Sequence, residues 1–166
     1  MRRIHSRFLV SVSLLFISNF LLAQGDVIKQ QSCDVASYQQ SIDSVKKLYA
    51  DQGFSVLREA SMMMESEYEM PVILPMTAGT LYQIVFIGDP TSRLYEIRMY
   101  DWTERQVIYK KNLWGDVDGP IISYSYVPQS SEYHMIKPVQ VNKKKKKLCG
   151  YILLMKKNGP NPQQQS

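Results

Sequence analysis

The chain has 166 residues, of which 20 are lysine or arginine and 15 are aspartate or glutamate, giving a formal net charge of +5. Most of this excess comes from two short segments, the arginines at positions 2, 3 and 7 and the lysines at positions 143–147. The rest of the chain lacks the evenly spread positive charge of a nucleic-acid-binding face, so nucleic acid is excluded as an expected partner. The length fits one domain of ordinary size.

The first 23 residues are typical of a secretory signal peptide. Three arginines precede an uncharged apolar run over residues 8–23, and Ala23 supplies a small residue before Gln24. This order of a basic end, an apolar centre and a small-residue exit predicts export and cleavage. We therefore expect a periplasmic or extracellular protein that begins near Gln24. No later apolar stretch is long enough to span a membrane, so no span is expected after cleavage; a retained N-terminal anchor is the alternative.

Residues 24–33 are polar and are expected to form a leader before a single helix. Apolar side chains recur every three or four residues from Val35 to Tyr49, with polar residues between them. This spacing predicts an amphipathic helix within residues 34–53 that packs on the rest of the domain. Gly53 is placed where a left-handed residue would end the helix.

After Gly53 the apolar residues alternate, and turn residues divide the chain into eight predicted strands. These strands cover approximately residues 55–64, 68–76, 81–88, 93–101, 106–111, 120–127, 132–139 and 148–156. The third is apolar on both sides, which predicts a central position. Short strands with hairpin-like spacing indicate a mainly β protein, an antiparallel β-sandwich that is jelly-roll-like, over residues 54–157. Residues 158–166 have no apolar anchor and are expected to form a disordered tail.

Residues 74–157 also carry a recognisable pattern. Thr77-Ala78-Gly79 leads into an apolar strand, the next strand ends in Tyr100-Asp101, and Cys149-Gly150-Tyr151 lies in the last. This pattern resembles the bacterial pre-peptidase C-terminal domain, a jelly-roll sandwich appended to many secreted enzymes. Ser131 stands where that family usually has glycine. The resemblance implies a sandwich fold and no catalytic residue, because such domains are accessory.

Cys33 and Cys149 are the two cysteines of the chain. In an exported protein they can form a disulfide, or they can remain two separate buried thiols. A disulfide would close a loop of more than a hundred residues. In the chain-entropy model such a loop stabilises the fold by roughly 4–5 kcal/mol.

Aromatic residues in two turns are candidate binding residues. Trp102 follows Asp101 and Trp114 precedes Gly115, with Tyr100 and Tyr109 near them in sequence. Exposed rings on a sandwich can stack on sugars or anchor a protein partner. The size and usual burial of tryptophan favour the other alternative, in which both rings are buried and close the two ends of the sandwich.

A lysine run between the last two predicted strands is a second candidate surface. It consists of Lys143, Lys144, Lys145, Lys146 and Lys147. Such a run can contact anionic lipid, glycan or an acidic partner. The pattern favours the alternative, a solvated hairpin tip that resists aggregation.

Groups suited to catalysis are sparse. His134 is the only histidine after residue 23 and falls within a predicted strand, which favours a structural role. The chain has no nucleophile elbow, no phosphate-binding glycine loop and too few histidines for a histidine-based zinc site. Carboxylates such as Asp89, Glu96 and Asp101 keep glycoside hydrolysis open. We therefore expect a protein that is not an enzyme, with no catalytic residue, no cofactor and no metal.

Together these features predict an exported, non-catalytic interaction module of the bacterial envelope. It would bind an envelope protein or help to assemble surface or secretion machinery. A carbohydrate-binding module that uses Trp102 or Trp114 for stacking is the alternative, with a glycan as partner. A small secreted hydrolase is the third.

Overall fold

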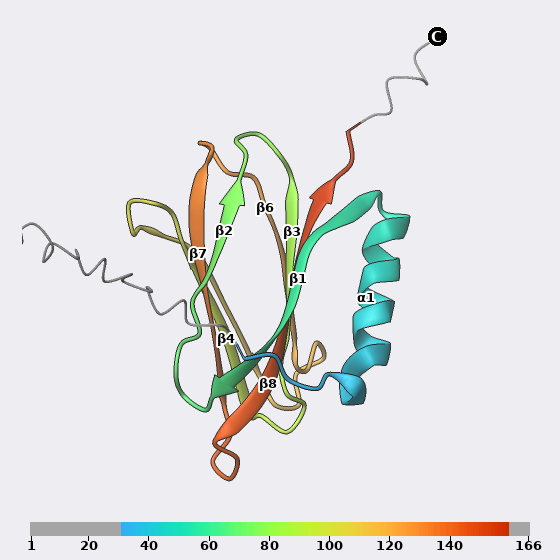
Figure 1. Cartoon of the computed structure of the whole chain (residues 1–166), viewed down its shortest axis with the longest axis vertical. Helices are drawn as coiled ribbons and strands as arrows, with labels where there is room; N and C mark the ends of the chain where they lie inside the picture. Colours follow the sequence, from blue (N-terminus) through green and yellow to red (C-terminus); the bar gives the residue numbers. More distant parts are fainter. Residues whose placement is uncertain (1–30, 160–166) are drawn as a thin grey trace, which may run out of the picture.

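The chain folds into two packed β-sheets with one helix on the outside, as the computed structural model shows for residues 31–159 (Figure 1). The predicted signal peptide, residues 24–30 of the predicted leader and all but the first two residues of the predicted tail lie outside these described residues. A 3-10 helix, Ala36–Tyr38, leads into α1 (Gln39–Asp51). The strands are β1 (Phe54–Glu65), β2 (Val72–Met76), β3 (Tyr82–Ile87), β4 (Leu94–Tyr100), β5 (Gln106–Leu113), β6 (Ile121–Tyr126), β7 (Glu132–Val141) and β8 (Lys147–Lys157).

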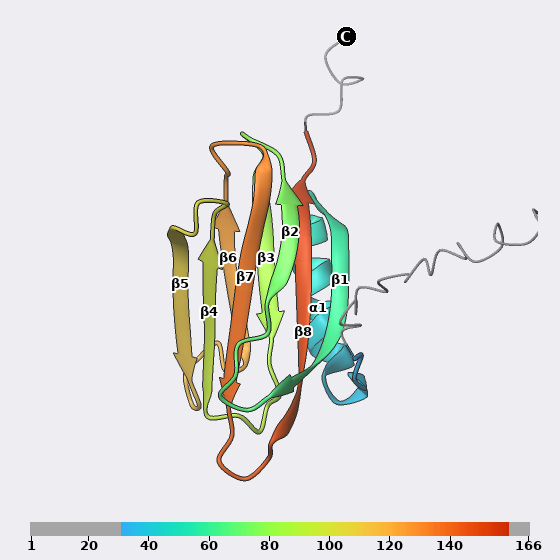
Figure 2. The ribbon, with the colours of Figure 1, turned by 60° about the vertical axis from the view of Figure 1, so that its left-hand side comes forward.

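The strands form two four-stranded sheets. Their orders are β1-β8-β3-β6 and β2-β7-β4-β5, and all neighbouring strands run antiparallel. This is the strand order of a jelly roll, so the predicted mainly β, antiparallel sandwich with one N-terminal helix is confirmed. In Figure 2 the second sheet is in front, and α1 lies on the far side of β1 and β8.

The bounds of one strand differ clearly from the sequence prediction. We expected a strand over residues 68–76, but β2 begins at Val72. Residues 66–71 cross from the first sheet to the second: Ser66 N donates to the Lys146 carbonyl at 2.7 Å, and Met70 N to the Pro138 carbonyl at 3.1 Å. Glu67 has a φ of 76°, which a continuing strand does not allow. The other strands agree with the prediction to within two residues.

The central strands of the first sheet, β3 and β8, are buried on both faces. The inner face of this sheet supplies Met62, Ile84, Phe86 and Leu154 to a core shared with the second sheet. On its outer face a second cluster of buried residues joins α1 to the sheet, and it includes Ile42, Val45, Val85, Leu153 and Met155. Every residue of β3 is therefore buried, and β3 lies between β8 and β6, which confirms the predicted central strand.

The helix ends as its sequence predicts. Gly53 has a φ of 76°, a backbone conformation that glycine adopts without steric cost. The chain then turns back, and the Phe54 ring meets the Tyr49 ring edge-on, with centroids 5.8 Å apart. No helix among the described residues has the length and apolar character needed to cross a membrane.

Candidate binding site at the basic end

Three loops far apart in sequence meet at one end of the sandwich. The starting residue of β4, Leu94, pairs with Leu113 at the end of β5 and with Val141 at the end of β7. The β3–β4, β5–β6 and β7–β8 connections therefore emerge together, with the β7–β8 loop at the bottom of Figure 1. Trp114 N donates to the Arg93 carbonyl at 2.9 Å, which joins two of these loops directly. We call Arg93, Trp114 and residues 143–147 the basic end.

The surface of the basic end has two adjoining hollows. One, of about 420 Å³, is lined by Thr91, Arg93, Asn142 and three of the lysines. The other, of about 540 Å³, is lined by Thr91, Arg93, Leu113 and Trp114. Thr91 and Arg93 belong to both hollows, and neither lining contains a carboxylate. The fold thus brings Trp114 and the lysine run, two candidates from the sequence, onto one surface.

Asn142 holds the backbone of the lysine loop in place. Its side-chain oxygen accepts hydrogen bonds from Lys144 N at 2.9 Å and Lys145 N at 3.1 Å. Its side-chain nitrogen donates to the Thr91 carbonyl at 2.8 Å. Its backbone N–H donates to Ser66 Oγ at 2.9 Å. Asparagine commonly organises turns in this way, and here it fixes the loop that carries the cations.

One lysine of the loop is engaged by a buried carboxylate. Lys145 Nζ lies 2.6 Å from Asp89 Oδ2. Burial opposes ionisation of Asp89, but hydrogen bonds from Lys145 and Thr91 outweigh it and lower the pKa of Asp89 below its usual value. The other four lysines and Arg93 form no ion pair with any of residues 31–159. These five cations are therefore available to an outside partner.

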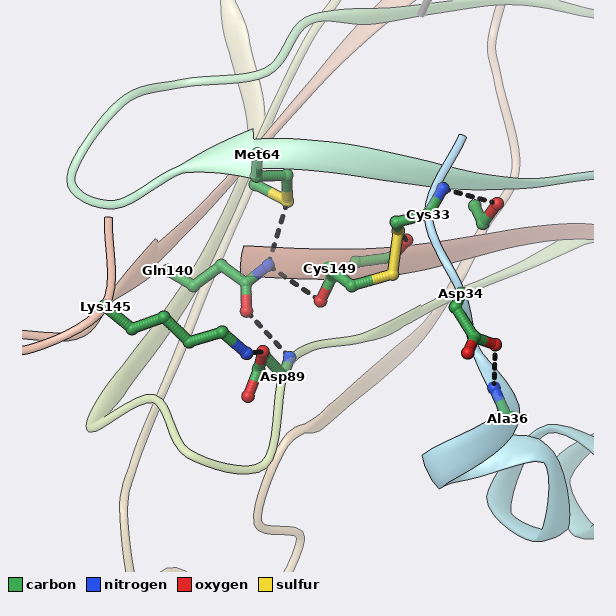
Figure 3. Close-up of a disulfide and its surroundings, with 10 residues drawn as sticks. Cys33, Asp34, Ala36, Met64, Asp89, Gln140, Lys145 and Cys149 are labelled. Carbon is green, nitrogen blue, oxygen red and sulfur yellow. Dashed lines mark hydrogen bonds and ion pairs between the residues drawn. A yellow bond between two sulfur atoms is a disulfide. The ribbon is translucent and has the colours of Figure 1, made fainter. Parts of the chain in front are cut away.

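A buried polar cluster anchors the basic end to the core (Figure 3). The side chain of Gln140 is fully buried; its oxygen accepts from Asp89 N at 2.8 Å, and its nitrogen donates to the Cys149 carbonyl at 3.1 Å. Cys149 is joined to Cys33 by a disulfide with a Cα–Cα distance of 5.8 Å. A buried network whose members are all paired is rigid. The loops of the basic end are therefore held to a fixed base.

Both tryptophans are exposed, so the expectation that they plug the ends of the sandwich is wrong. Trp102 is 71% exposed and Trp114 is 73% exposed. Smaller aromatic residues close the ends instead. At the basic end Tyr95 is buried and its hydroxyl donates to the Asp89 and Ser92 carbonyls, both at 2.9 Å.

The opposite end is closed by buried His134. Its Nε2 lies 3.1 Å from the hydroxyl of Tyr126, and the two rings meet edge-on. His134 and Tyr126 therefore occupy the end of the sandwich at which Trp102 was expected to be buried.

The remaining aromatic candidates lie away from the basic end. Trp102 is in the β4–β5 turn, at the other end of the β4–β5 hairpin, with its ring centroid 6.3 Å from that of Tyr133. Tyr100 and Tyr109 lie on the outer face of the second sheet. The Tyr109 hydroxyl donates to Glu96 at 2.8 Å, and Lys137 Nζ lies 5.1 Å from the centroid of the Tyr100 ring. The structure does not join these residues to Trp114.

The three carboxylates considered for hydrolysis lie in separate clusters. Asp89 is bound by Lys145, Glu96 by Arg98 at 3.0 Å and Tyr109 at 2.8 Å, and Asp101 by Arg105 at 3.0 Å. Each carboxylate thus has its own partner within the fold.

Sequence reasoning missed Arg93 of the basic end and three residues that line or support it, which are Thr91, Gln140 and Asn142. Asn142 directly precedes the lysine run, and its turn-forming character is a local signal. Gln140 is a polar residue at an inward position of a strand, which also signals a buried network. Arg93 and Thr91 gave no signal, because only the pairing of β4 with β5 and β7 places them beside Trp114 and the lysines.

Comparisons with known proteins identify no family. No protein-family model and no curated protein matches the chain. The dimeric latent PorU of Porphyromonas gingivalis is 11% identical over 63% of this chain and 13% of that chain, with a TM-score of 0.34. The glycosylation-associated Gap123 complex of Streptococcus agalactiae is 10% identical over 68% and 44%, with a TM-score of 0.32.

A third solved structure, Drosophila melanogaster CENP-C bound to CAL1, is 7% identical over 71% of this chain and 98% of that chain, with a TM-score of 0.30. The chain spans less than two thirds of the length of the first two structures. With scores this low, the three likenesses carry no argument about function.

Proposed function

We propose that this chain is an exported, non-catalytic interaction module of the bacterial envelope, and that it binds an acidic protein partner through the basic end. The observation that carries the proposal is the convergence of Trp114, Arg93 and the lysine loop around two adjoining hollows. The resemblance of residues 74–157 to the pre-peptidase C-terminal domain belongs to the same proposal, because domains of that family are accessory.

The chemistry of the basic end suits a protein surface rich in carboxylates. Arginine and tryptophan are the residues that most often dominate binding energy at protein interfaces, and here they lie side by side. Clustered lysines raise the rate of encounter with an acidic partner and contribute less to the final affinity. The fixed base formed by Asn142, Gln140 and Asp89 reduces the entropy lost when the partner binds.

The disulfide supports the proposed location. Disulfides form and persist in oxidising compartments such as the periplasm and the extracellular space. Cys33 lies ten residues beyond the predicted cleavage point. The signal sequence and the paired cysteines therefore favour the same compartment, although they are independent features of the chain.

A charge-reversal experiment tests the proposal. The wild type, a Lys143→Glu/Lys144→Glu/Lys146→Glu variant and a control variant, Lys47→Glu/Lys110→Glu/Lys111→Glu, would be used to capture proteins from envelope extracts. All six lysines are exposed and the two variants have the same net charge. We expect the wild type and the control variant to capture an acidic protein that the loop variant does not capture. The amount captured should fall as the salt concentration is raised. Equal capture by the two variants would contradict the proposal.

Carbohydrate binding is a second candidate, which the exposure of both tryptophans favours. Flat exposed rings can stack on sugar faces, and Trp102 has a second ring, Tyr133, beside it. A glycan array with the wild type, Trp102→Ala and Trp114→Ala separates the candidates. A glycan whose binding is abolished by either substitution, with no protein captured from envelope extracts, would place carbohydrate binding first.

A further inference from the structure

The sandwich is open along one side, between the edge strands of its two sheets. β1 is the edge of the first sheet and β2 is the edge of the second. Between them lies a groove of about 970 Å³, which we call the side groove. Its lining is mainly apolar and includes Leu57, Ala60, Met70, Val72, Ile152 and Leu154. Leu74, Ile152 and Leu154 belong to the buried core, so the groove opens directly onto it.

The first half of β1 is exposed although it is rich in apolar residues. Residues 55–59 are exposed, whereas Met62 and Met64 in the second half are fully buried. Val56 is 41% exposed and Leu57 is 47% exposed. An exposed apolar edge strand is unusual, since it presents unpaired backbone groups that can pair with another chain. The side groove and the open edge therefore form one feature.

The same edge of β1 is already contacted by residues 31–33 farther along. Met63 N donates to the Gln31 carbonyl at 2.7 Å, and Cys33 N lies 3.4 Å from Ser61 Oγ. This segment runs antiparallel to β1. At Cys33 the disulfide to Cys149 directs the chain away toward α1 (Figure 3). Among the described residues, none continues this pairing over residues 56–60.

From Arg58 onward the backbone of the open stretch is oriented for pairing, whereas the register with β8 shifts between Val56 and Arg58, which marks an irregularity at Leu57. N–H groups alternate in direction along a strand, so Glu59 N–H points to the same edge as Met63 N–H. A stretch of five residues spans about 17 Å, close to the length of an ordinary strand. An added strand would close the open side, and every second side chain of it would enter the side groove.

We propose that the side groove binds an extended segment of a partner protein, with apolar side chains at alternating positions, which pairs with β1 over residues 56–60. Strand addition to an exposed sheet edge is a general mode of peptide recognition, in which backbone hydrogen bonds give affinity and pockets for alternate side chains give specificity. The pairing would use the same edge of β1 as the hydrogen bond from Met63 N to the Gln31 carbonyl. The proposal is independent of the basic end.

The charges of β1 favour a different chain over a second copy of this one. A symmetric antiparallel pairing centred on Arg58 would place Arg58 opposite Arg58, and one centred on Glu59 would place Glu59 opposite Glu59. Like charges directly opposite each other destabilise a strand pair. A partner segment with apolar or uncharged residues at these positions has no such conflict.

Selection from a phage-displayed library of random dodecapeptides tests the proposal, with the selected peptide then made in plain and backbone N-methylated forms. We expect alternating apolar residues in the selected peptides. Leu57→Asp should weaken binding at least tenfold, whereas Leu48→Asp should bind as the wild type does. Leu48 is a matched control, since it is 52% exposed on α1 and Leu57 is 47% exposed on β1.

Two further measurements separate strand addition from simple apolar contact. N-methylation of the peptide should weaken binding at least tenfold, and the bound peptide should slow hydrogen exchange at the Glu59 amide. The proposal is overturned if no peptide is selected, if selected peptides bind Leu57→Asp as they bind the wild type, or if the Glu59 amide is not protected. A dimer of this chain that the peptide displaces from β1 would assign the groove to a second copy and overturn it as well.

Discussion

Removal of the Cys33–Cys149 disulfide should destabilise the protein by about 5 kcal/mol. The two cysteines are 116 residues apart in sequence. Cross-linking over that distance removes entropy from the unfolded chain, and the logarithmic dependence on loop length gives about 5 kcal/mol at 25 °C. The substitution pair Cys33→Ala/Cys149→Ala tests this value. Alanine introduces no polar group at Cys149, which packs against the cluster beneath α1.

Urea denaturation of the oxidised wild type, the reduced wild type and the double variant gives the comparison. The free energy of unfolding should fall by similar amounts in the last two proteins. In both of these proteins the free energy of unfolding should also fall more steeply with urea concentration, because an unfolded chain without the cross-link exposes more surface. A loss of less than about 1 kcal/mol in the double variant would refute the assigned role of loop closure. Two reactive thiols per chain in unreduced, denatured wild type would refute the disulfide itself.

Three further predictions concern packing, charge and the surface field. Gly150→Ala should cost about 1–3 kcal/mol of unfolding free energy, because the added Cβ would lie 2.7 Å from Met64 Sδ and 2.9 Å from a Phe86 ring carbon, whereas Gly159→Ala, with nothing within 4 Å, should be neutral. The folded pKa of Asp89 is lowered from 3.8, so its ionised form stabilises the fold above about pH 4 and that contribution disappears as the pH falls through the lower, folded value. The excess stability of the wild type over Asp89→Asn in denaturation curves from pH 7 to pH 2 should therefore shrink at the acid end, and an unchanged difference would contradict the ion pair with Lys145. Iodide should quench Trp114 in the Trp102→Phe variant more strongly than it quenches Trp102 in the Trp114→Phe variant, because Trp114 shares a hollow with the unpaired Arg93, whereas Arg105 in the turn of Trp102 is paired with Asp101. Equal quenching of the two rings in low salt would contradict this effect of charge.

The alternation of apolar residues was sufficient to predict the strands and the sandwich. β3 illustrates this, since six consecutive buried residues require cover on both faces and the chain offers one amphipathic helix to provide it. The start of β2 could not be predicted in the same way. Residues 66–71 contain apolar side chains, but hydrogen bonds to β7 and to the lysine loop decide their path, and such long-range contacts leave no periodic pattern.

The sequence was sufficient to identify individual residues of the candidate site, but not to predict that they lie together. Trp114 and the lysine run are conspicuous in the sequence, but about thirty residues separate them. Their meeting depends on the pairing of β4 with both β5 and β7. The exposure of Trp102 and Trp114 was predicted wrongly, because average burial says nothing about which aromatic residue closes a particular end. Tyr95 fills one end and His134 with Tyr126 fills the other.

Site-specific photo-crosslinking in the native cell tests most directly whether the basic end contacts a protein partner. A crosslinking amino acid would replace Trp114, Lys144 or, as a control on the exposed side of α1, Lys47. We expect an adduct of the same size from positions 114 and 144 and none from position 47. An adduct from position 47 alone, or no adduct from any of the three positions, would contradict binding of a protein at the basic end.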